Sequence, residues 1–309
     1  MIPITEILPS FSFLKKLTII KVSGKDTYRY LQNQITANMN LLKKNKYIFC
    51  GHCNDKGKVW STLFFFKKNN NYFYILRNSV YLNQVKAMKK YSIFFDVKIK
   101  KYKKFFLFGI SGVNAKKKLK KIFKILPKKK NPIIYLKENT LIWLKNLFER
   151  FLIIIPYKKL FSFKKKFEKA GFLKNNKQWL LIDIKENIPI IEKKTSLCFF
   201  PQEINLHKFE NALSFKKGCY IGQENIAKIK YKKLNKRSLF ILYCFYKQNI
   251  FSPGDFVYVK IKDNWIKKGI LLSSVIVSKK IIYVQVVLNN LYKKKNIYKI
   301  NNVFFKVFI

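Results

Sequence analysis

The sequence predicts an α+β protein in which two similar units stand in tandem and a small all-β barrel or sandwich follows them. Two observations predict this class. The order strand, helix, three strands, helix occurs twice before residue 235, and after Leu239 the pattern changes to short strands separated by turn-forming clusters. With 309 residues, of which 49% are hydrophobic and 17% aromatic, the chain can bury a large core, so a wholly disordered protein is excluded.

The first unit begins with an apolar strand at Leu17 to Val22. Ser23 to Asp26 forms a turn that can cap a helix, and Tyr28, Leu31 and Ile35 then recur at helical spacing. A meander of three strands, a second helix and a last strand follow, at Tyr47 to Cys50, Val59 to Phe66, Tyr72 to Leu76, Val80 to Tyr91 and Phe94 to Ile99.

The second unit repeats this order. It has a strand at Phe105 to Ile110, a turn at Gly112 and a helix at Asn114 to Ile125 that Pro127 ends. Strands near Ile133, Leu141 and Phe151 follow, and then a helix at Tyr157 to Ala170 with Gly171 at its C′ position. The β-rich segment begins near Asn235, and its turns include Pro253 to Asp255 and Asp263-Asn264.

The chain carries a formal net charge of +50, which comes from 61 Lys and only 4 Arg against 15 acidic residues. Lys, Asn, Ile, Phe and Tyr share A+T-rich codons, whereas phosphate and base recognition favours the planar fork of Arg. We therefore attribute most of the charge to genome composition, and we expect lysine runs such as Lys128 to Lys130 to be solvated.

No apolar run approaches the roughly 20 residues of a membrane-spanning helix. Pro3 and Glu6 stand near the amino terminus without a preceding basic patch, so we expect no secretory signal. Five cysteines, an odd number, favour free thiols in a reducing compartment. We expect a cytoplasmic protein with no membrane contact and no metal site.

Two cysteine patterns are candidates for chemistry. Cys50-Gly51-His52-Cys53 has a redox or metal spacing, but a strand follows it and the only other histidine is His207. We interpret it as a strand end in which Cys53 packs as a small apolar residue. In the second pattern, Cys219 lies between Gly218 and Gly222, where Lys217 and a following helix would favour a thiolate; an inert cysteine in a tight turn remains equally compatible with these residues.

The string formed by Lys217, Gly218, Cys219, Tyr220, Gly222, Gln223 and Glu224 resembles a motif of the YgfZ family, folate-binding proteins related to the T-protein of the glycine cleavage system. The resemblance continues from Asp26 to Thr36, from His52 to Ser61 and through Asn264-Trp265. It implies two ferredoxin-like-derived domains and a C-terminal β-barrel around a central channel. The implied boundaries are a folate-binding domain at 1–101, a second α+β domain at 102–235 that ends in the Cys219 loop, and the barrel at 236–309.

The resemblance also implies a function. The chain would bind tetrahydrofolate or a related folate and support iron–sulfur enzymes that modify tRNA by thiolation, with no classical turnover beyond any one-carbon chemistry on the folate. Cys219 falls on the family's functional thiol. Of two tryptophans that line the folate site in relatives, one matches Trp179, and the other falls at Leu17, a change that should weaken stacking on the ligand.

Two alternative functions remain open. A folate-dependent aminomethyltransferase would need a carboxylate near the meander turn, yet no Asp or Glu lies between Gly57 and Asp96. A direct RNA-binding module would use lysines for phosphates and aromatic rings for stacking, but most rings fall in apolar runs that core packing explains. Direct contact with tRNA is therefore left undecided by the sequence.

Overall fold

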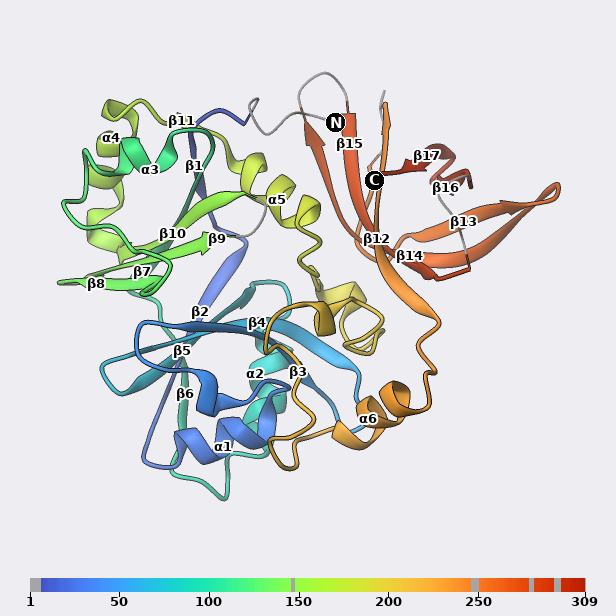
Figure 1. Cartoon of the computed structure of the whole chain (residues 1–309), viewed down its shortest axis with the longest axis horizontal. Coiled ribbons are helices and arrows are strands. Elements are labelled where there is room, and N and C mark those ends of the chain that lie inside the picture. The colour runs from blue at the N-terminus through green and yellow to red at the C-terminus, as the bar shows by residue number, and fades with distance from the viewer. Residues whose placement is uncertain (1–6, 146–147, 246–249, 278–280, 292–295, 309) are drawn as a thin grey trace.

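The computed structural model describes residues 7–145, 148–245, 250–277, 281–291 and 296–308. Within them lie a five-stranded sheet, a six-stranded sheet and a closed six-stranded barrel. Figure 1 shows the two sheets with their helices one above the other and the barrel beside them. The predicted α+β class with a C-terminal barrel is confirmed.

The first sheet has the strand order β3-β4-β5-β2-β6. Its strands are β2 (Leu17–Ser23), β3 (Tyr47–Cys53), β4 (Val59–Lys68), β5 (Asn71–Arg77) and β6 (Lys98–Lys101). Helices α1 (Thr27–Gln34) and α2 (Tyr81–Lys90) accompany it, with a 3-10 turn η2 (Met39–Leu41) between α1 and β3. Apolar side chains of α1, η2, α2 and the sheet form one buried cluster that includes Tyr30, Leu31 and Met88.

The second sheet has the order β11-β1-β7-β10-β9-β8. Its strands are β1 (Ser10–Phe13), β7 (Phe105–Ser111), β8 (Ile133–Leu136), β9 (Asn139–Lys145), β10 (Glu149–Pro156) and β11 (Leu173–Lys174). The helical elements α3 (Ala115–Leu119), η3 (Tyr157–Lys159), α4 (Leu160–Lys169) and α5 (Asn176–Lys185) belong to the same part. Because β1 pairs with β7, this sheet also contains residues on the amino-terminal side of the expected boundary at 101.

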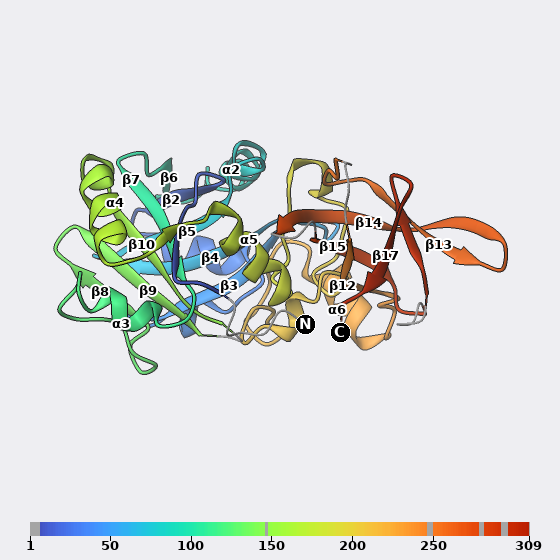
Figure 2. The same cartoon turned by 90° about the horizontal axis from the view of Figure 1, so that it is seen from above.

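The barrel closes in the order β12-β15-β14-β13-β16-β17, with β12 pairing to β17. Its strands are β12 (Arg237–Phe245), β13 (Phe256–Ile261), β14 (Asn264–Val277), β15 (Ile281–Asn289), β16 (Tyr298–Ile300) and β17 (Val303–Val307). The turns η4 (Lys193–Thr195) and η5 (Leu206–Lys208) and helix α6 (Gln223–Tyr231) lie in the connection from α5 to the barrel. Seen from above, α5 passes between the sheets and the barrel (Figure 2).

Three local predictions are wrong. The sequence predicted that Tyr28, Leu31 and Ile35 share one face of a helix, but Tyr28 is 40% exposed and Ile35 is already in extended backbone. The buried residues of α1 are Thr27, Tyr30, Leu31 and Gln34. The strand predicted from Phe94 begins only at Lys98, since Phe95 N donates to Ser92 O in a turn and Phe94 is 86% exposed.

The helix predicted at 114–125 ends at Leu119. Lysines recur at i,i+4 spacing there, as in Lys116 and Lys120, and like charges at that spacing destabilise a helix. Backbone bonds from Ile122 and Phe123 to Leu119 O continue the segment as turns.

Candidate functional site

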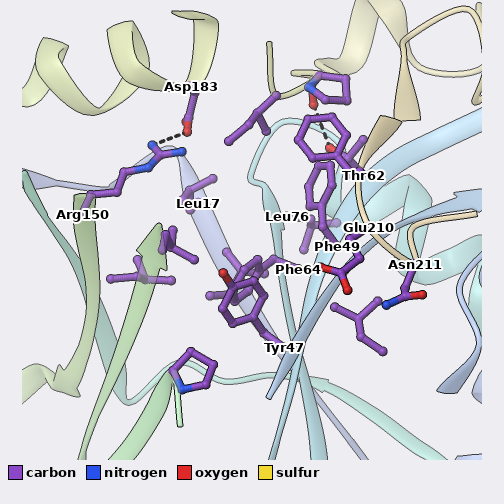
Figure 3. Close-up of a pocket in the computed structure, with 18 of the residues that line it drawn as sticks. Leu17, Tyr47, Phe49, Thr62, Phe64, Leu76, Arg150, Asp183, Glu210 and Asn211 are labelled. Atoms are coloured by element: carbon purple, nitrogen blue, oxygen red, sulfur yellow. Dashed lines mark hydrogen bonds and ion pairs between the residues drawn. The ribbon is translucent and has the colours of Figure 1, made fainter. Parts of the chain in front are cut away.

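A cavity of about 520 Å³ lies between the two sheets and is the site we consider for ligand binding (Figure 3). Its walls come from β2, β3, β4 and β5 of the first sheet, from β9 and β10 of the second, from α5 and from the loops at 43–46, 188–190 and 209–211. Leu17 and Trp179, the two positions that the sequence singled out for folate, both line it. The cavity is mainly apolar with a few polar groups, as is usual for small-molecule sites.

Arg150 on β10 is the most deeply buried arginine in the lining of this cavity. Its side chain is only 1% exposed, and its two terminal nitrogens donate to Asp183 Oδ1 at 2.6 Å and Glu186 Oε2 at 2.7 Å. Both carboxylates come from α5 and its C-terminal cap. Arg150 with these two ion pairs, here called the Arg150 fork, therefore joins that helix to β10. The remaining nitrogen, Nε, is buried and has no protein acceptor among the described residues.

Trp179 forms part of the wall and is 6% exposed. The guanidinium of Arg150 lies 4.6 Å from its ring centroid, and a Cβ on Gly109 of β7 would lie 2.1 Å from its Cε3 atom. Gly109 is therefore required so that the indole can pack directly against the backbone of β7. With Arg150 and Gly109 against it, Trp179 offers a ligand little free ring surface.

Tyr47 on β3 and Phe64 on β4 are two of the half-buried rings that line the cavity. Tyr47 is the first residue of β3 and Phe64 lies in the middle of β4, and their rings stack across the two neighbouring strands with centroids 4.7 Å apart and planes 29° apart. Both are half-buried and point into the cavity in Figure 3. Burial raises the pKa of the Tyr47 hydroxyl, a shift that the nearby Arg150 charge opposes.

Charged side chains lie in the loops of the lining. Lys43 and Lys46 belong to the loop that precedes β3, and Asn45 O in this loop accepts a backbone hydrogen bond from Ile133 N of the second sheet. Glu210 lines the cavity from the loop that follows η5. The loops of the lining thus carry two lysines and one carboxylate, in addition to Arg77, Arg150 and Asp183 on the strands and α5.

The Cys219 loop lies apart from this cavity, and none of its motif residues lines it. Cys219 is exposed, whereas Lys217 is partly buried and its ammonium donates to Gln32 O and to Ile35 O at 2.5 Å. Burial lowers the pKa of Lys217 to about 8. The sequence suggested that Lys217 would support a thiolate, but the hydrogen bonds of its ammonium go to carbonyls at the end of α1.

The rest of the motif fixes the loop to its surroundings. Ile221 N donates to Asn33 O at 3.1 Å, and Tyr220 N donates to Gln223 Oε1 at 3.1 Å. Tyr220 is buried among apolar side chains. Gly222 is the N-cap of α6 with φ +78°, and Glu224 is exposed in the first turn, where the helix dipole favours an acidic residue.

The first cysteine pattern is structural. Cys50 and Cys53 are buried in β3, and burial raises the pKa of both thiols, that of Cys50 to about 12. His52 is 1% exposed with its Nδ1 3.3 Å from Gln84 Nε2, and burial lowers its pKa to about 3. Cys53 packs in an apolar cluster, as predicted. The described ranges contain no group of three or more His, Cys, Asp or Glu residues placed to hold a metal ion.

Sequence reasoning found Leu17 and Trp179 but missed Tyr47, Phe64 and the Arg150 fork. Arg150 had a signal, because it is one of only 4 Arg in the chain and directly precedes the apolar run of a strand. The roles of Tyr47 and Phe64 depend on the register between β3 and β4, which a list of aromatic residues does not reveal.

Comparisons with known proteins decide the family. A family model described as "YgfZ, beta-barrel domain" matches residues 235–302. The chain is 40% identical over 300 residues to a protein of Buchnera aphidicola subsp. Acyrthosiphon pisum named tRNA-modifying protein YgfZ, covering 97% of this chain and 93% of the relative. This chain belongs to the YgfZ family.

A YgfZ protein of the same name from Yersinia enterocolitica is 34% identical over 272 residues, which cover 88% of this chain and 82% of the relative. Among solved structures, the glycine cleavage system aminomethyltransferase T from Bartonella henselae superposes with a TM-score of 0.73 at 11% identity, covering 98% of this chain and 85% of that one. At that identity the likeness shows that this YgfZ chain shares the fold. No helix in the described parts of the chain is long and apolar enough to cross a membrane.

Proposed function

We propose that this chain binds a reduced folate in the cavity between its two sheets and supports tRNA modification in the cytoplasm as an accessory protein for iron–sulfur enzymes. The observation that carries the proposal is the cavity itself, about 520 Å³ in volume, with Leu17, Trp179, Tyr47 and Phe64 in its walls. The role in tRNA modification is inferred from the name that the curated relatives carry.

The residues of the cavity fit a folate. Tyr47 and Phe64 offer ring faces to the flat pterin or aminobenzoate group, and Arg150 Nε is a buried donor that a ligand oxygen or nitrogen would satisfy. Lys43 and Lys46 suit the carboxylates of a glutamate tail. A bound tetrahydrofolate would supply a carrier for one-carbon units.

A titration tests the ligand. Tetrahydrofolate should bind the wild type, and Leu17→Trp should bind it about 2- to 12-fold more tightly, because a stacked ring adds roughly 0.5–1.5 kcal/mol. Leu234→Trp, at a 48% exposed site outside the cavity, is the matched control and should leave the affinity unchanged. A wild type that binds no folate, or equal effects of both substitutions, would contradict the proposed ligand.

A complementation experiment tests the thiol. In a bacterial strain that lacks its own family member, the wild type and Cys198→Ala should restore thiolated tRNA, while Cys219→Ala should not. Cys198 is a suitable control because it is the other cysteine that is not fully buried. Restored thiolation by Cys219→Ala would rule out an essential role for this thiol.

A further inference from the structure

One side of the barrel, here called the covered side, packs against α5 and the connection that precedes the barrel. The opposite side, here called the free side, faces away from the two sheets. On the covered side, Leu239 and Val287 pack in the cluster around Tyr220, and Tyr283 packs against Leu181 and Ile184 of α5. Strands β13, β16 and β17 and the first part of β14 lie on the opposite side, and the β13–β14 hairpin extends away from the two sheets (Figures 1 and 2).

The free side carries an alternation of inward and outward residues. Val257, Val259 and Phe305 are fully buried in the barrel core. The outward set, here called the outer barrel face, consists of Phe256, Tyr258, Lys260, Trp265, Lys267, Lys299, Phe304 and Lys306. Phe256 and Phe304 are 43% and 58% exposed. No Asp or Glu lies in β13, β14, β16 or β17.

Strand pairing places rings and ammonium groups side by side on this face. Tyr258 lies opposite Lys267 on one neighbour and Lys299 on the other, and Lys299 in turn lies opposite Phe304. The rings of Trp265 and Phe304 are 5.6 Å apart, and Lys299 Nζ lies 4.6 Å from the Trp265 centroid. The outer barrel face therefore combines four lysines with four rings, of which Phe256 and Phe304 are exposed and Tyr258 and Trp265 are half-buried.

We propose that the outer barrel face binds single-stranded RNA. Unpaired bases stack on aromatic side chains, and lysines beside the rings neutralise the phosphates. Genome composition alone accounts for lysine runs such as Lys128 to Lys130, which stand without an aromatic neighbour in sequence. It does not account for the exposed rings of Phe256 and Phe304, which lie beside lysines on the side of the barrel that faces away from the two sheets.

The test measures binding of a fluorescent oligouridine RNA of about 12 nucleotides, a length within the range of single-strand sites. The triple variant Lys260→Gln, Lys267→Gln and Lys299→Gln should bind more weakly and lower the slope of log affinity against log salt by about 2. The matched control is Lys128→Gln, Lys129→Gln and Lys130→Gln, which removes the same charge from an exposed turn. Equal losses in the two triple variants would mean non-specific attraction by the net charge and would overturn the proposal.

The contribution of the aromatic rings to RNA binding is tested separately from that of the lysines. Trp265→Ala should weaken RNA binding about fivefold or more, since a stacked base contributes roughly that factor or greater. Phe161→Ala, at a 74% exposed ring on α4, should leave it unchanged. Phe304→Ala is the substitute if Trp265→Ala does not fold. Unchanged binding by the folded ring variant would overturn the proposal.

A polyglutamate peptide and anionic phospholipid vesicles, each matched to the RNA in charge, distinguish the alternative partners. RNA should bind more tightly than either, and only RNA binding should depend on Trp265. Equal or tighter binding of the peptide or the vesicles would show a general polyanion surface and overturn the assignment to RNA.

Discussion

A Cβ atom on Gly222 would lie 2.7 Å from Cα of Gly57, so the turn between β3 and β4 and the turn before α6 meet backbone to backbone. Both glycines have positive φ, +76° for Gly57 and +78° for Gly222. This contact joins the meander of the first sheet to the loop that presents Cys219. The two glycines are therefore needed for the position of the loop as well as for its shape.

Gly222→Ala should lower the free energy of unfolding by more than about 3 kcal/mol, because a side chain costs roughly 1–2 kcal/mol at this φ and would also overlap Asn54 O at 2.3 Å. Gly218→Ala is the matched control. Gly218 also has positive φ, +88°, but nothing lies within 4 Å of its added Cβ, so only the strain of about 1–2 kcal/mol should appear. Urea unfolding of both variants measures the difference, and equal losses would show that the Gly57 contact contributes nothing.

Arg150→Leu should lower the free energy of unfolding by about 3–5 kcal/mol, because it removes the buried cation that pairs with the carboxylates of Asp183 and Glu186; the Glu186 side chain is only 1% exposed. Arg237→Leu removes a weaker pair, in which the arginine is 49% exposed and 3.9 Å from Glu203, and should cost less than about 1 kcal/mol. Thermal unfolding of the two variants compares them. A cost for Arg150→Leu no larger than that for Arg237→Leu would mean that the fork does not hold α5 to β10.

Lys217 should make the free energy of unfolding rise with pH between about pH 8 and pH 10. Its pKa is lowered to about 8 in the folded protein, whereas an unfolded lysine stays protonated to about pH 10.4. Between these values the unfolded state binds the extra proton, so this group should add about 1–3 kcal/mol to the free energy of unfolding as pH rises from 8 to 10. The measurement is the difference in that free energy between the wild type and Lys217→Met at several pH values. A difference that stays constant with pH would contradict the lowered pKa.

The fold class could be predicted from the sequence because the patterns that indicate strands and helices are local and occur repeatedly. Leu17 to Val22 and Phe105 to Ile110 were found as strands since an apolar run between turn clusters needs no distant partner to be seen. The strand start predicted at Phe94 was wrong, because an apolar residue in a turn cannot be distinguished in sequence from one in a strand. The predicted length of the helix at 114–125 was wrong, because the apolar spacing favours a helix while repulsion between its closely spaced lysines destabilises one.

The site was predicted less well, because its parts meet only through tertiary structure. Leu17 and Trp179 are far apart in sequence and line one cavity. The pairing of Tyr47 with Phe64 and the fork from Arg150 to α5 follow from strand register and from how α5 packs. The placement of Lys217 against Ile35 O also required the structure, since proximity in sequence had suggested Cys219 as its neighbour.

Cys219 should react before every other cysteine of the native protein. It is exposed, Cys198 is half-buried with its pKa raised by burial, and Cys50, Cys53 and Cys244 are buried. The thiolate is the reactive form, and the reagent must be able to reach it. In the reaction of the wild type with a disulfide reagent at neutral pH, one thiol should therefore react fast and the others in slower phases. Cys219→Ser should remove the fast phase, and Cys198→Ser should leave it intact. A fast phase that survives in Cys219→Ser would show that another thiol is accessible and that the loop does not present Cys219 as the structure places it.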